Sequence, residues 1–356
     1  MDSRIDRLSQ LVRNKGLDAY VVMRDPNVFY LTGSISGGRL ILTRNEEPTL
    51  LVGRLNLACA QDQAKGCGVK PYTRKEQIDL IVTELGGGDL ETIGFDEISL
   101  SMYNDLSGRM PDVELRTAPE IIGSMRRVKD AGEIELMKRA AELADIGMDA
   151  INDCIVDGIR ENEVAAEAAY AMRREGADSL AFPFIVVSGP RSAYPHGGVT
   201  DRKIKRGEFV TIDMGAGYKE YKTDITRTFI VGSPTERQVE IYETVLSANL
   251  SALRKIRKGV SGAEVHADAE RVIGEAGYGE YFIHGLGHGV GLEVHEGPSL
   301  GKTSEDILEV GNVVTNEPGI YIPGYGGVRI EDTVLVTTSD PVCLTETPKD
   351  LDAMRV

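Results

Sequence analysis

Five side chains in the second half of the chain have the types and spacing of ligands for divalent metal ions. They are four carboxylates and one imidazole: Asp213, Asp224, His288, Glu317 and Glu331. The first two lie in runs rich in β-branched residues, FVTIDMGAGY and YKTDITRTFIV. A hairpin folded between Tyr218 and Lys219 places Asp213 directly opposite Asp224, where the Cβ atoms are roughly 5 Å apart. Two negative charges at that spacing are destabilising unless a cation lies between them.

The second acid pair repeats this arrangement. Glu317 lies in NVVTNEPGIYI and Glu331 in GVRIEDTVLV, and Gly324 is the midpoint between them. Four carboxylates on two hairpins, with one imidazole, suit hard or borderline divalent cations. The alternative is that acidic residues are common in exposed strands and pair by accident. Two such pairs with a histidine-rich stretch between them favour the metal site.

The histidines support this interpretation by their position. The chain has five, and three of them, His284, His288 and His295, fall in the stretch HGLGHGVGLEVHEGP. The alternating glycines permit unusual dihedral angles and close approach of other groups. An exposed glycine-rich turn is the alternative. A dinucleotide-binding loop is not indicated, because the stretch does not fit GxGxxG followed by a helix. His266 lies in a predicted helix and is expected to have a packing or surface role.

Composition limits the classes of function. At 356 residues the chain is long enough for two domains, with 41% hydrophobic and 27% charged residues. The net charge of −16 argues against nucleic acid or an anionic membrane as partner. No apolar run reaches the ~18 residues of a membrane span, and the first residues contain no apolar signal core. The four cysteines form no CxxC pair, so we expect reduced thiols and a cytoplasmic location.

The order of predicted elements indicates two domains of different type. Residues 1–120 alternate strands and helices, beginning with an amphipathic helix over 3–15, and form a small α/β domain. Residues 121–356 begin with a long helix, for which Asp130 and Glu133 form a capping box. Ser261 and Glu264 form another, and YFIH is predicted to be a strand. The same offset of 104 residues separates Ala131 from Thr235 and Asp213 from Glu317. We infer an internal duplication, with each half giving one acid hairpin to a site on a pseudo-twofold axis.

These motifs resemble those of the pita-bread metallopeptidases, which comprise methionine aminopeptidase, aminopeptidase P, prolidase and the non-metal enzyme creatinase. The resemblance is carried by DMGAGYKEYKTDITRTF, HGLGHGVGLEVHE, NEPGIYI and GGVRIEDT. The stretch GLDAYVVMRDPNVFYLTG is similar to the creatinase-type N-terminal domain of prolidases and aminopeptidases P. The resemblance implies an α+β protein: a creatinase-type α/β domain over 1–120 and a pita-bread catalytic domain over 121–356.

The resemblance also implies roles for individual residues. Asp213 would chelate one metal ion, His288 and Glu317 the other, and Asp224 and Glu331 would bridge both. Glu317 would also take a proton from the attacking water. The remaining predicted site residues are His196 and His295, as catalytic residues, and His284, Arg329 and Tyr221, as residues that contact substrate or support the site.

The expected activity is that of a dinuclear exopeptidase that hydrolyses Xaa-Pro bonds by a metal-bridging hydroxide. Dipeptides are the expected substrates, as for a prolidase. The alternative is an aminopeptidase P that acts on longer peptides, and an alternative of another class is a non-catalytic peptide-binding scaffold. The resemblance further implies two divalent ions per subunit (manganese, cobalt, iron or zinc) and a homodimer.

Overall fold

The computed structural model describes residues 3–44, 46–86 and 90–356. The chain divides into two compact units, Met1–Arg126 and Arg127–Val356. Across the described ranges, no helix has the combined length and apolar character needed to cross a membrane.

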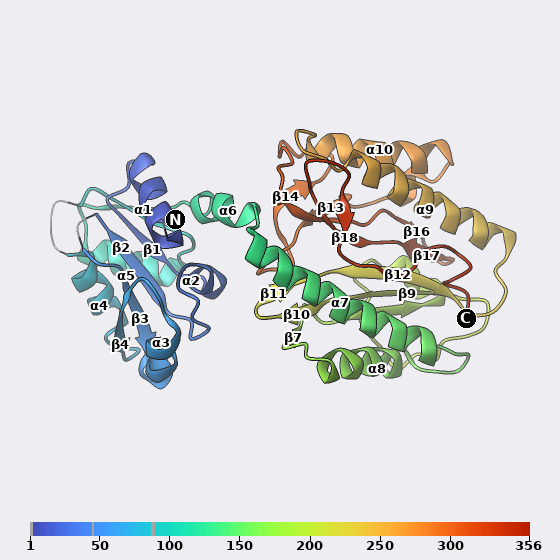
Figure 1. The fold of residues 1–356 in the computed structure, drawn as a ribbon, viewed down its shortest axis with the longest axis horizontal. Coiled ribbons are helices and arrows are strands. Elements are labelled where there is room, and N and C mark those ends of the chain that lie inside the picture. The colour runs from blue at the N-terminus through green and yellow to red at the C-terminus, as the bar shows by residue number, and fades with distance from the viewer. Residues whose placement is uncertain (1–2, 45, 87–89) are drawn as a thin grey trace. The chain divides into compact units, whose positions relative to one another are not determined.

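The first unit is an α/β domain built on one six-stranded sheet (Figure 1). The strand order is β4-β3-β2-β1-β5-β6, in which β1 pairs antiparallel with β2 and parallel with β5. The strands are β1 (Ala19–Val22), β2 (Arg39–Thr43), β3 (Thr49–Gly53), β4 (Gly68–Tyr72), β5 (Thr92–Phe95) and β6 (Glu114–Thr117). The helices are α1 (Arg4–Asn14), α2 (Asp25–Thr32), the 3-10 helix η1 (Arg54–Asn56), α3 (Leu57–Gln63), α4 (Gln77–Leu85), α5 (Leu100–Arg109) and α6 (Glu120–Arg127).

The division between the units falls after Arg126 rather than after residue 120. Helix α6 explains the difference, because its apolar face packs into the first unit. Ile122 and Met125 are fully buried, and Tyr30 Oη donates to Met125 O at 3.0 Å. The boundary between the two units therefore lies one helix later than the predicted boundary after residue 120.

The second unit holds two pairs of helices with strands between them. In Figure 1, α7 (Ala131–Cys154) and α8 (Glu161–Arg174) lie on one side of the strands, and α9 (Glu236–Lys255) and α10 (Gly262–Glu275) on the other. The predicted capping boxes at the starts of α7 and α10 are both present. The YFIH prediction is wrong: residues 279–281 form a short 3-10 helix, η3, and no strand follows there.

The strands of the second unit repeat one arrangement. Strand β9 (Phe209–Met214) pairs antiparallel with β8 (Ile185–Ser188) and β12 (Ile225–Ile230), and β15 (Val313–Asn316) pairs in the same way with β13 (Gly287–Gly289) and β18 (Asp332–Leu335). The remaining strands are β7 (Ser179–Leu180), β10 (Ala216–Tyr218), β11 (Tyr221–Lys222), β14 (Glu296–Leu300), β16 (Gly319–Ile322), β17 (Gly326–Arg329) and β19 (Val342–Cys343); η2 is Gly189–Ala193. Two helices followed by an acid hairpin thus occur twice, as the 104-residue offset predicts.

The predicted register is wrong for the first hairpin. Asp213 pairs with Thr226, and Tyr218 pairs with Tyr221. The turn consists of Lys219 and Glu220, both at positive φ (47° and 71°). Positive φ at both positions is what a two-residue hairpin turn needs if it is to match the twist of its strands. The observed partner of Asp213, Thr226, lies two positions beyond the predicted partner, Asp224. An even displacement keeps a side chain on the same face of the sheet, so the two aspartates still share a face.

The predicted register is confirmed for the second hairpin. Gly319 pairs with Arg329 and Ile322 with Gly326, which centres the turn on Gly324. The same register continues into β15 and β18, where Asn316 pairs with Asp332. Glu317 and Glu331 therefore face each other where the two strand pairs meet. The two hairpins join each other at a backbone bridge between Thr226 and Glu331.

Candidate metal centre

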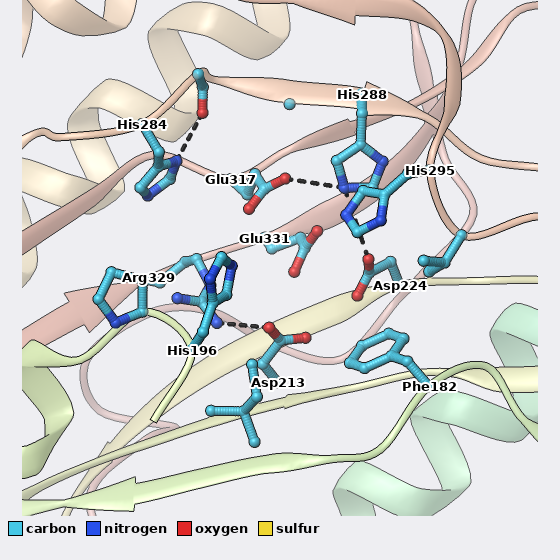
Figure 2. Close-up of a pocket in the computed structure, with 15 residues that line it drawn as sticks. Phe182, His196, Asp213, Asp224, His284, His288, His295, Glu317, Arg329 and Glu331 are labelled. Carbon is cyan, nitrogen blue, oxygen red and sulfur yellow. Dashed lines mark hydrogen bonds and ion pairs between the residues drawn. The ribbon is translucent and has the colours of Figure 1, made fainter. Parts of the chain in front are cut away.

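A cavity of about 350 Å³ in the second unit collects almost all of the predicted site residues (Figure 2). Its lining includes all five predicted metal ligands together with His196, His284, His295 and Arg329. Apolar side chains complete the wall: Phe182, Ile185, Pro195 and Val294. The cavity is thus lined by residues up to 149 positions apart in the sequence (182 to 331).

Three buried carboxylates in this cavity each carry an oxygen that no described residue satisfies. Asp213, Asp224 and Glu331 are 9%, 5% and 1% exposed. Asp213 Oδ1, Asp224 Oδ1 and Glu331 Oε1 make no hydrogen bond within the described part of the chain. Buried oxygens of this kind are costly unless something pairs with them, and a cation is the partner that carboxylates accept most readily.

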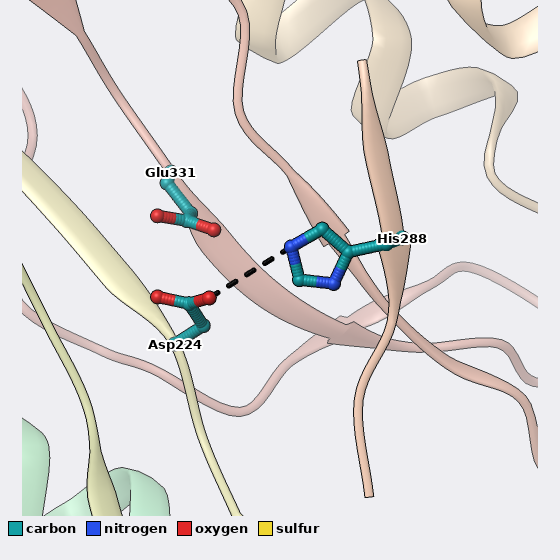
Figure 3. Close-up of side chains that lie close together, drawn as sticks. All are labelled: Asp224, His288 and Glu331. Atoms are coloured by element: carbon teal, nitrogen blue, oxygen red, sulfur yellow. Dashed lines mark ion pairs between the residues drawn. The ribbon is translucent and has the colours of Figure 1, made fainter. Parts of the chain in front are cut away.

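His288 lies close enough to Asp224 and Glu331 for the three side chains to share one metal ion. One ligand atom each from Asp224, His288 and Glu331 lies within 4.8 Å of the others (Figure 3). His288 Nε2 is 3.8 Å from Asp224 Oδ2 and 3.2 Å from Glu317 Oε1. Oxygen and imidazole donors at this spacing fit a divalent cation of the hard or borderline class.

The cavity brings more carboxylates together than the nearby cationic groups, Arg329 and His288, can balance. Burial, and then the charges of Glu331 and Asp213, raise the pKa of Asp224 well above its ordinary value. Burial, and then the charges of Glu317 and Asp213, raise the pKa of Glu331 well above its own. Burial also opposes ionisation of Glu317, but the hydrogen bond and charge of His288 outweigh it and lower its pKa to about 2. A bound cation would relieve the repulsion among these groups.

Arg329 links the acid cluster to two polar neighbours. Its Nη2 donates to Asp213 Oδ2 at 2.5 Å and its Nη1 to Tyr321 Oη at 2.9 Å. Its Nε donates to Thr226 Oγ1 at 3.0 Å, and Thr226 Oγ1 donates to Glu331 Oε2 at 2.7 Å. The guanidinium therefore fixes one oxygen of Asp213 and, through Thr226, one oxygen of Glu331, which leaves the other oxygen of each available to a cation.

The other histidines occupy different parts of the cavity wall. The ring of His295 lies 4.1 Å from the ring of His288, centroid to centroid. Burial, and then the charge of His288, lower the pKa of His295. His284 Nε2 lies 2.9 Å from Tyr321 Oη, and burial lowers the pKa of His284. His196 is exposed, and it lies beside Asp213 and Arg329 in Figure 2.

Tyr221 is the predicted site residue that the structure does not bring to the cavity. It is 3% exposed and its Oη donates to Glu133 Oε1 at 2.8 Å, on α7. Tyr221 stands an odd number of residues before Asp224, so in extended chain the two side chains point to opposite faces. Its contacts lie with the helix behind the sheet.

Three polar residues of the site were not predicted from the sequence: Thr226, Thr315 and Tyr321. Thr315 Oγ1 donates to Glu317 Oε1 at 3.0 Å and accepts from His288 N at 3.0 Å. Thr226 follows Asp224 by two positions, and Thr315 precedes Glu317 by two. Strand alternation alone places each threonine on the same face as its neighbouring ligand, and this signal could have identified both. The signal for Tyr321 was weaker, because a tyrosine in a strand is most often a packing residue.

Comparison with known proteins places the chain in a class. The profile of the Creatinase/Prolidase N-terminal domain matches residues 4–128, and that of metallopeptidase family M24 matches residues 135–338. Together with the relatives described next, this match shows that the chain belongs to metallopeptidase family M24. Membership implies divalent metal ions, and the orphaned carboxylate oxygens beside His288 fit them.

The relatives are similar over the whole chain. The Xaa-Pro dipeptidase of Pyrococcus furiosus is 41% identical over 99% of this chain and 100% of its own length. The crystal structure of the prolidase of Pyrococcus horikoshii is 39% identical with a TM-score of 0.92, covering 98% of this chain and 99% of that one. The X-Pro aminopeptidase of Thermotoga maritima is 34% identical with a TM-score of 0.91, covering 100% of both chains.

Proposed function

We propose that this protein is a metal-dependent Xaa-Pro dipeptidase. The observation that carries the proposal is the convergence of three buried, unsatisfied carboxylate oxygens with His288 and Glu317 in one cavity. The substrate class is supported by the Xaa-Pro dipeptidase and prolidase relatives, which match over nearly the full length of both chains.

Asp213, Asp224, His288, Glu317 and Glu331 would hold the metal, and we propose two divalent ions per subunit, from among manganese, cobalt, iron and zinc. When bound, such ions supply Lewis acidity that polarises a carbonyl and lowers the pKa of water. Arg329 and Thr226 hold the two acid hairpins in register for this purpose. Metal analysis of purified protein, in ions per chain, tests the number and identity of the ions.

The chain's own groups can carry the proton transfer. Glu317 lines the cavity beside His288, and its lowered pKa means that it is ionised near pH 7. We propose that this ionised carboxylate accepts a proton from the attacking water. A carboxylic acid formed in this way can deliver the proton to the leaving nitrogen. The lowered pKa of His295 keeps its imidazole neutral near pH 7, with one ring N–H available to the developing oxyanion. His196 lines the same cavity and is proposed to contact the substrate near the scissile amide.

The cavity supports a small substrate with an apolar residue. Its volume of about 350 Å³ is at the low end of the ~300–1,000 Å³ usual for ligand pockets. Phe182, Ile185 and Val294 offer an apolar surface beside the acid cluster. A dipeptide of an apolar residue and proline suits both the size and the lining.

An aminopeptidase specificity is the second candidate. It is favoured by the full-length similarity to the X-Pro aminopeptidase of Thermotoga maritima. The two activities differ in whether the enzyme accepts chain beyond the proline. We further propose that the protein is a homodimer, which sedimentation equilibrium would measure, and that it acts in the cytoplasm.

The test compares the hydrolysis of Met-Pro and Met-Pro-Ala in the presence of manganese or cobalt, with a chelator control. Cleavage of the dipeptide that the chelator abolishes is the expected result. Faster cleavage of the tripeptide would replace the proposal with the aminopeptidase. Cleavage of neither peptide by metal-loaded protein would refute both.

A further inference from the structure

A buried carboxylate forms hydrogen bonds with both ends of the loop that carries His196. Glu161, the first residue of α8, is fully buried. Its Oε1 accepts from Ser188 N at 2.9 Å and Ser188 Oγ at 2.8 Å, and its Oε2 accepts from Thr200 N at 3.2 Å and Thr200 Oγ1 at 2.5 Å. Ser188 ends β8, and Thr200 lies beyond the loop. Glu161 thus binds both ends of the segment 188–200.

Arg191 connects this carboxylate to the backbone beside His196. Its Nη1 forms an ion pair with Glu161 Oε2 and also donates to Thr200 Oγ1 at 3.2 Å. Its Nη2 donates to Gly197 O at 2.8 Å and to Gly198 O at 3.2 Å. The planar guanidinium therefore fixes the carbonyl groups of the two residues that follow His196. The fork of arginine allows this geometry, and a lysine ammonium does not.

His196 itself depends on this backbone support. It is exposed at the rim of the cavity, so packing around the ring does not by itself determine where the imidazole points. The loop has little freedom to shift, because a Cβ on Gly197 would lie 2.5 Å from Val187 Cγ1. Gly197 N also donates to Tyr194 O at 3.1 Å. The position of the ring therefore follows from the position of the loop.

We propose that Glu161 and Arg191 are positioning residues that place His196 for the reaction. Neither side chain lines the cavity, and neither is assigned a chemical role in the proposed hydrolysis. Arg191 acts on the Gly197 and Gly198 carbonyls, and Glu161 holds Arg191 and both ends of the segment. The inference rests on the proposed function for the role of His196 in turnover, but the placement of the ring can be measured without catalysis.

The kinetic test is a double-mutant cycle between Arg191→Met and His196→Ala, with metal content and melting temperature measured for every variant. If Arg191 acts through His196, Arg191→Met lowers kcat on the preferred peptide by a factor between about 10 and 100, the scale of a misplaced reacting group. In the His196→Ala background the same substitution changes kcat by less than about twofold, because the group it positions is already gone. Equal losses in both backgrounds would overturn the proposal.

Two further variants control the cycle. Arg160→Met is the matched control, since Arg160 Nη1 donates to Asp201 O at 2.6 Å, just beyond the segment 188–200 and away from His196. Its kcat should stay within about twofold of wild type. Glu161→Gln keeps the shape of the side chain and removes its charge, so it should reproduce the loss seen with Arg191→Met. Unchanged kcat in Glu161→Gln would show that Glu161 has no positioning role. If Arg191→Met does not fold, Glu161→Gln replaces it in the double-mutant cycle.

A spectroscopic test separates this inference from the proposed function. The chain has five histidines, so the ring resonances of metal-free protein with labelled histidine can be assigned by comparison with His196→Ala. In Arg191→Met, or in Glu161→Gln if needed, the His196 resonance should move or broaden while that of the buried His266 stays in place. An unmoved His196 resonance refutes the positioning role, even if the protein hydrolyses neither peptide.

Discussion

Thr226 and Glu331, one from each acid hairpin, are joined through both backbone and side chains. Glu331 N donates to Thr226 O at 3.1 Å, and Thr226 Oγ1 donates to Glu331 Oε2 at 2.7 Å. The same hydroxyl accepts from Arg329 Nε. A single small side chain thus sets the orientation of a predicted bridging ligand where the two halves of the unit meet.

Thr226→Val should weaken metal binding while keeping the fold. Valine keeps the shape of threonine but cannot donate to Glu331, and loss of a partner behind a metal ligand costs about 10- to 100-fold in metal affinity or activity. Titration calorimetry of metal into chelator-treated protein measures the effect. Thr211→Val is the control, since Thr211 lies in the same sheet as Thr226 and its Oγ1 hydrogen-bonds to Gly327 O and Thr228 Oγ1 rather than to a predicted ligand. Equal affinity in Thr226→Val and wild type would contradict the role.

Asp224→Asn should stabilise the metal-free protein and remove its response to metal. Burial raises the pKa of Asp224, and the charges of its acidic neighbours raise it further, so a neutral amide suits the metal-free site better than a carboxylate. Wild-type protein at a metal concentration 100 times Kd should gain about 2.7 kcal/mol of stability. Thermal melts with chelator and with manganese measure both effects. A metal-dependent shift of wild-type size in Asp224→Asn would mean that Asp224 is not a ligand.

His295→Ala should lower kcat by a factor on the order of 10²–10³ with metal still bound, as expected when one oxyanion donor is lost. Its ring lies beside that of His288, a predicted ligand, so the two roles must be separated. Metal content and kcat are measured on the same preparation. Loss of metal from the variant would show that His295 is a ligand instead.

His266 should make the fold less stable in mild acid. Leu286 N donates to His266 Nδ1 at 3.2 Å, and burial lowers the pKa of His266, with Glu270 raising it and Lys302 lowering it to smaller extents. Below the ordinary histidine pKa of about 6.5, the unfolded chain binds a proton that the folded protein does not. The stabilising contribution is therefore complete above that pH and is lost as pH falls toward the folded-state pKa.

Urea unfolding at pH 8 and pH 5.5, with chelator present so that metal release does not contribute, measures this effect. His266→Gln keeps an acceptor for Leu286 N and removes the titrating group. Its stability should fall less between the two pH values than that of wild type. An identical fall in both proteins would show that His266 does not cause the pH dependence.

The sequence alone indicated the candidate metal ligands, the centre of the second hairpin and the starts of two helices. The residue types of Asp213, Asp224, His288, Glu317 and Glu331 define a ligand set. The centre of the second hairpin follows from the symmetric placement of Gly324. The capping boxes at the starts of α7 and α10 also follow from the sequence, because a helix start is fixed by contacts three residues apart. The hairpin centre and the capping boxes depend on local interactions, which a sequence displays directly.

The tertiary structure decided what depends on distant partners. The turn at Lys219 and Glu220 displaced the first register by two positions, because strand twist selects the turn. Tyr221 lies against Glu133 on α7, and the burial of α6 set the domain division after Arg126. The network of Glu161, Arg191 and Thr200 likewise joins segments up to 39 residues apart. A buried carboxylate such as Glu161 is stable only where hydrogen-bond donors surround it, and these donors are brought together by the tertiary structure.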